Sequence, residues 1–78
     1  HPFVLYPNPT SGEFTVEFNS IQKNTTVDIF TLTGQKIQST KLENSSTAKI
    51  RLQHPNGLYF VDVKDDEGKE YFLKVVKR

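Results

Sequence analysis

The chain has 78 residues, 35% of them hydrophobic, with a formal net charge of +1 and no cysteine. This length allows one small domain with a thin core, for which we expect a net stability of roughly 3–5 kcal/mol. The near-neutral charge argues against nucleic-acid binding, and the lack of cysteine excludes disulfides and thiol chemistry. No apolar run approaches the ~20 residues that a helix needs for direct membrane insertion.

Short runs with alternating apolar and polar residues recur every ~8–12 residues, a pattern typical of an all-β domain. No window of ~11 residues repeats its apolar residues with the 3.6-residue period of a helix. β-Branched and aromatic residues dominate instead. The sequence predicts strands at residues 3–6, 13–18, 26–32, 35–42, 47–52, 58–64 and 69–76, with loops or turns at 19–25, 33–34, 43–46, 53–57 and 65–68.

Seven short strands predict a compact antiparallel β-sandwich, immunoglobulin-like in its strand count, in which two small sheets pack face to face. The chain is shorter than the usual ~100 residues of that fold and lacks its Cys and Trp hallmarks. A single β-meander or a small barrel is the structural alternative. The residues predicted to be buried are Val16, Val27, Ile29, Ile37, Ile50, Tyr59, Val61, Val63 and Val75, with Ile21 as the apolar anchor of the loop at 19–25.

The corner between the first two strands is rich in residues that fix the backbone. Pro7 and Pro9 restrict their own φ and force Tyr6 and Asn8 into extended geometry, while Gly12 can adopt a positive φ. Such a corner allows a strand to cross between two packed sheets. An ordinary well-built turn is the simpler interpretation.

We find no pattern that indicates catalysis, a metal site or a cofactor. The two histidines, His1 and His54, are far apart, and no serine lies in a nucleophile-elbow motif. The acidic run at residues 65–67 lacks the ligand spacing of a calcium loop and is predicted to be a solvated hairpin tip. The sequence therefore predicts a protein that is not an enzyme.

The aromatic side chains divide between the two faces of the predicted strands. Phe14 and Phe18 are in phase with aliphatic residues and are predicted to lie in the core, whereas Phe30, Phe60 and Phe72 fall on the opposite faces. Three outward phenylalanines would form a patch large enough to bind a partner. Loops or a sheet seam could instead cover them.

The last strand is apolar on both faces and ends in basic residues. An edge strand of this kind, with unpaired backbone groups, is a template for strand addition by a partner or by a second copy in an edge-strand dimer. An ordinary last strand guarded by lysines is the alternative. The candidate recognition residues are Lys74, Val75, Val76, Lys77 and Arg78.

Four blocks of the sequence resemble the C-terminal sorting domain of proteins that the type IX secretion system of Bacteroidetes exports. They are YPNPTSG at residues 6–12, VDIFTLTGQKI at 27–37 with Gly34 at its turn, NGLYFVDV at 56–63 with Gly57, Tyr59 and Val61, and KVVKR at 74–78. The blocks follow the family's order and spacing over nearly the whole chain. Leu73 stands where many relatives carry a second lysine, which leaves the role of charge there open.

This resemblance implies a single non-catalytic domain, residues 1–78, that follows a cargo domain outside this sequence. Its partners would be the outer-membrane translocon and the cell-surface sortase, which would cut at or before His1. The cargo would be secreted or held at the cell surface after passage through the periplasm. The alternative is an accessory module that binds carbohydrate or protein, although the lack of Trp and of polar groups on the outward Phe residues weakens it.

Overall fold

The computed structural model describes residues 2–78 and folds them into five antiparallel strands, with no helix in that range. It therefore contains, among these residues, no helix that could cross a membrane. The all-β antiparallel prediction is confirmed. The strands are β1 (Phe3–Tyr6), β2 (Glu13–Phe30), β3 (Lys36–Arg51), β4 (Gly57–Lys64) and β5 (Glu70–Lys77).

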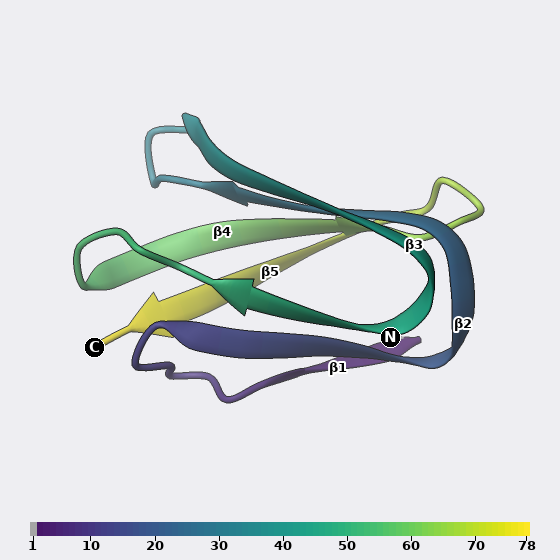
Figure 1. The fold of residues 1–78 in the computed structure, drawn as a ribbon. Helices are drawn as coiled ribbons and strands as arrows, with labels where there is room; N and C mark the ends of the chain where they lie inside the picture. Colours follow the sequence, from purple (N-terminus) through teal and green to yellow (C-terminus); the bar gives the residue numbers. More distant parts are fainter. Residues whose placement is uncertain (1) are drawn as a thin grey trace.

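The strands form one sheet in the order β1-β2-β4-β5, with β3 also paired to β2. Residues 13–17 of β2 pair with residues 47–51 of β3, and residues 22–30 pair with 36–45. Between these two blocks, residues 18–21 of β2 lie opposite residue 46 alone. A bulge of this size bends both strands, so the two halves of the β2–β3 hairpin lie in different layers (Figure 1).

The prediction of seven strands is wrong because the chain does not break at residues 19–25 or 43–46. Gln22 is only 6% exposed, and its Oε1 accepts a hydrogen bond from Asp66 N at 3.2 Å. Lys23 N donates to Asp66 Oδ2, also at 3.2 Å. These contacts hold the polar stretch of β2 against the β4–β5 turn, and Ile21, the predicted loop anchor, is 69% exposed. The predicted sandwich of two separate sheets is not confirmed, nor is its immunoglobulin-like character, since one continuous sheet folds over itself.

The core lies between the layers. Val61, for example, is fully buried on β4 between Ile29 of β2 and Leu73 of β5. Ile37 is only half-buried, contrary to the prediction, because among residues 2–78 β3 pairs with one neighbouring strand, β2. The buried apolar residues are Phe3, Phe14, Val16, Phe18, Val27, Ile29, Ala48, Ile50, Leu52, Tyr59, Val61, Val63 and Val75.

Candidate functional site

The proline-rich corner makes its main contacts with β5. After β1 the chain crosses to the outer edge of β5, where Thr10 forms a parallel bridge with Lys77. Thr10 N donates to Val76 O at 2.8 Å, and Arg78 N donates to Thr10 O at 2.9 Å. The corner thus connects strands at opposite ends of the sheet order before β2 begins at Glu13, within one sheet and not between the two packed sheets that were expected.

The side chain of Asn8 extends this pairing by one further step. Its Nδ2 donates to Lys74 O at 2.8 Å, and its Oδ1 accepts from Val76 N at 3.1 Å. A side-chain amide has the same donor and acceptor as a peptide group, so Asn8 occupies the place of a neighbouring strand residue. We call these contacts of Asn8 and Thr10 with the main chain of residues 74–78 the β5 clamp.

Thr10 and Gly12 fix the shape of the corner from within. Thr10 is 2% exposed, and its Oγ1 donates to Glu13 O at 2.7 Å and accepts from Gly12 N at 3.0 Å. Gly12 has φ = +142°, which favours glycine, and its carbonyl accepts a hydrogen bond from Leu52 N at 2.6 Å. The clamp is therefore anchored to the ends of β2 and β3.

The predicted recognition residues at the end of β5 have different environments. Val75 is fully buried, and Lys77 is half-buried with its Nζ donating to His54 O at 2.6 Å, so both hold the fold together. Lys74 and Arg78 are exposed. The expected open edge is not found at residues 76–78, because the clamp bonds both outward main-chain groups of Val76 and the amide of Arg78, and it also bonds the carbonyl of Lys74.

The remaining motif residues have contacts that stabilise turns and strands. The Tyr59 hydroxyl donates to Pro55 O and so fixes the loop before β4, which begins at Gly57. Gly34, with φ = +90°, closes the β2–β3 turn through Gly34 N and Thr31 O at 2.9 Å. These two turns were correctly predicted.

Tyr6 ties β1 to β2 at the start of the corner. Its hydroxyl donates to Glu17 Oε1 at 2.6 Å. This hydrogen bond, followed by desolvation and the negative charge of Glu17, raises the pKa of Tyr6 above its ordinary value.

The outward phenylalanines do not form one exposed patch. Phe30 and Phe60 face each other across β2 and β4 and are both half-buried, while Phe72 on β5 is 70% exposed. Lys36 Nζ lies 5.8 Å from the centre of the Phe30 ring. Of the three, Phe72 alone is left largely uncovered.

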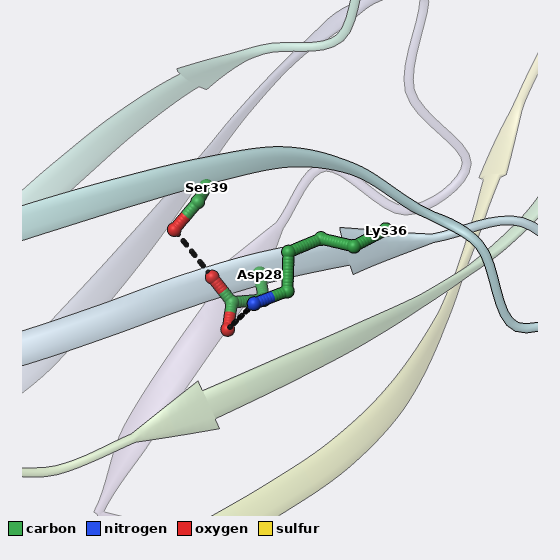
Figure 2. A network of polar contacts seen from close by, with 3 residues as sticks. All are labelled: Asp28, Lys36 and Ser39. Atoms are coloured by element: carbon green, nitrogen blue, oxygen red, sulfur yellow. Dashed lines mark hydrogen bonds and ion pairs between the residues drawn. The ribbon is translucent and has the colours of Figure 1, made fainter.

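Next to Phe30 and Phe60, the outer face carries a polar network. Ser39 Oγ donates to Asp28 Oδ1, and Lys36 Nζ lies 3.4 Å from Asp28 Oδ2 (Figure 2). Both oxygens of the Asp28 carboxylate are thus engaged by side chains from β3. The arrangement compensates the charge of Asp28 on a sheet face that also carries other carboxylates.

Asp62 lies opposite Asp28 on β4 and is 8% exposed, and no group in the described part of the chain forms a hydrogen bond with its Oδ1. Burial raises the pKa of Asp62 to about 6, helped by a hydrogen bond with Glu70 and the charges of Glu70 and Asp28, and opposed by Lys64. Within residues 2–78, no three histidine or carboxylate side chains lie where they could hold a metal ion. We therefore assign no ligand to this cluster.

Two of these residues were not singled out from the sequence. Nothing distinguishes Thr10 from Ser11 in the sequence, because the strand that Thr10 bridges lies 67 residues further along the chain. On β4, Asp62 alternates with residues that face the core, and this pattern predicts that its side chain is solvated. Its burial depends instead on the neighbouring strands.

The fold and the β5 clamp define a small all-β domain whose first and last motifs form one structure. A family model described as a secretion system C-terminal sorting domain matches residues 4–78. The chain therefore belongs to this family of type IX sorting domains, and the resemblance drawn from the four sequence blocks is confirmed. No curated protein matches the chain.

Membership of this family defines the role at a general level. The domain acts as a C-terminal sorting signal, interacts with the type IX secretion machinery, and is exported to the cell surface or secreted. The family implies a source among the Bacteroidetes, and its members are in general non-catalytic.

Proposed function

We propose that this domain is the C-terminal part of a longer exported protein, directs that cargo through the outer-membrane translocon, and is then removed by a cell-surface sortase. In this proposal the domain itself catalyses nothing. The observation that carries the proposal is the β5 clamp, because it joins the proline-rich motif and the basic motif in one folded surface. The expected sortase junction, at or before His1, lies outside the described residues.

We infer that the translocon recognises the side chains presented around this clamp. Lys74 and Arg78 are exposed and positively charged, and the main chain beneath both is held by Asn8 and Thr10. Because strand addition at residues 74–78 would first have to displace the clamp, recognition of the ordered side chains requires less rearrangement. Val75 and Lys77 support the surface from inside.

Charge reversal tests this surface better than deletion, because removing residues 75–78 would also remove buried Val75. The variant Lys74→Glu/Arg78→Glu is compared with Lys41→Glu/Lys49→Glu, which reverses two exposed lysines on β3. Each is fused to the C-terminus of a periplasmic reporter in a Bacteroidetes host, and folding is checked by thermal melting. We expect only the first variant to leave the reporter in the periplasm. Equal export of two folded variants would contradict the recognition surface.

Removal by the sortase is tested on the same exported reporter. We expect mass spectrometry of the secreted reporter to find no peptides from residues 1–78. A secreted reporter that retains the domain would contradict removal. The accessory carbohydrate-binding alternative gains no support, since Phe30 and Phe60 are half-buried and Phe72 alone provides no flat aromatic platform.

A further inference from the structure

The outer edge of β5 consists of a clamped part and an open part. Along β5, the main-chain N–H and C=O groups of successive residues point alternately toward β4 and away from it. Those of Glu70, Phe72 and Lys74 point away from β4, like those of Val76. The clamp bonds Val76 and the carbonyl of Lys74. Within residues 2–78, no hydrogen bond from another element reaches the outward main chain of Phe72. The main-chain groups of Glu70 and Phe72 and the amide of Lys74 that point away from β4 therefore form an open edge, and the contact of Asn8 with the Lys74 carbonyl marks its limit.

The sequence of this open edge is self-complementary. It reads Glu-Tyr-Phe-Leu-Lys, so an antiparallel copy centred on Phe72 places Glu70 opposite Lys74 at both ends. Opposite charges that face each other across two strands stabilise the pairing, and like charges destabilise it. A parallel copy would place Glu70 opposite Glu70 and Lys74 opposite Lys74.

The exposure of Phe72 also points to a partner. It is 70% exposed and lies in the middle of the open edge, where an aromatic side chain is a liability unless another molecule covers it. In an antiparallel pair, directly opposite residues lie on the same face, so the two Phe72 rings would cover each other on the outer face of the sheet.

We propose that two copies of this domain associate through residues 70–74 of β5, in an antiparallel pair centred on Phe72. The two copies are related by a two-fold axis, and β5 of each adds to the sheet of the other. The Asn8 contact prevents the pairing from extending beyond Lys74, so the ladder is short and the association reversible. This inference goes beyond the sorting function and does not depend on it.

Charge exchange tests the register of the pair. Glu70→Lys puts two lysines at the edge of each copy and also removes the hydrogen bond of Glu70 with Asp62, whereas Lys74→Glu puts two glutamates there. In sedimentation equilibrium of the 78-residue chain, we expect each variant alone to dissociate about tenfold more readily than the unchanged chain. An equimolar mixture of the two variants restores both charge pairs, and we expect it to associate as strongly as the unchanged chain.

Two results would overturn this inference. One is that the chain without substitutions remains monomeric at every concentration, in which case the open edge would bind a different partner. The other is a mixture that associates no better than either variant alone. Thermal melting of each variant shows whether a loss of association results from unfolding. The mixture experiment is carried out only with variants that remain folded.

A disulfide provides a second, independent test, since the chain has no cysteine of its own. Hydrogen-bonded antiparallel pairs have Cα atoms about 5.5 Å apart, which is within the range that a disulfide spans. We therefore expect Phe72→Cys to form a covalent dimer under mild oxidation much faster than Ile21→Cys, a matched control on β2 with an equally exposed side chain (69%). Equal rates of cross-linking for the two variants would contradict the proposed pair.

Discussion

The side-chain oxygen of Asn8 accepts a hydrogen bond from the main-chain nitrogen of Val76, 3.1 Å away, although the two residues are 68 positions apart. Asn8 thereby fills a place on the sheet edge that another strand would otherwise occupy. The consequence is that the two ends of the domain depend on each other: the corner after β1 covers the end of β5, and hydrogen bonds to the β5 main chain hold the corner in place.

Replacing Asn8 by Ala should destabilise the domain. The change removes both hydrogen bonds to β5, at a cost of about 1–2 kcal/mol, and should lower the melting temperature by roughly 5–10 °C. Hydrogen exchange at the Val76 amide should also become faster. Asn56→Ala is the control, because Asn56 is exposed in the loop before β4. Unchanged exchange at Val76 would show that the clamp does not protect β5.

The fold was predictable where its determinants are local. Alternation at residues 58–64 marks β4, and Gly34 and Gly68 mark the two hairpin turns with positive φ. The bend in β2 was not predictable, because a polar stretch normally indicates a loop. Here Gln22 is bonded to Asp66, 44 residues away, and the strand continues.

The candidate site was predictable in the same partial way. The two prolines around Asn8 indicate a rigid corner, and resemblance to a known family selects the basic residues after Leu73. That Asn8 contacts Lys74 could not be derived, since neither alternation nor turn chemistry specifies which distant strand lies beside a corner. Within residues 2–78, the part of this edge that stays unpaired therefore ends at the Lys74 carbonyl, which Asn8 bonds.

Asp62 should make stability depend on pH. Its pKa is raised from 3.8 to about 6 in the folded state, so the folded domain binds this proton more tightly than the unfolded chain does. The resulting stability is present below pH ~4 and is lost as the pH rises towards 6. Asp62→Asn removes this dependence and should stabilise the domain by about 1–3 kcal/mol at pH 7, but not at pH 4. Melting at the two pH values measures this, and an equal gain at both would contradict it.

Val61 should be critical to the thin core. Val61→Ala removes fully buried methyl groups and leaves a cavity, which should cost about 1–3 kcal/mol. With so small a domain, a loss of this size could unfold most molecules at growth temperature. Val4→Ala makes the same change at a position that is 59% exposed and should melt nearly like the parent chain. Equal melting of the two variants would contradict the burial of Val61 in the core.

Export of a fused reporter tests most directly whether these residues are a sorting signal. Residues 1–78 are joined to the C-terminus of a periplasmic reporter in a Bacteroidetes host, and the reporter is measured in the periplasm, on the cell surface and in the medium. We predict that the fusion reaches the surface or the medium, whereas the reporter without these residues remains in the periplasm. A folded fusion that remains in the periplasm as well would contradict the sorting function.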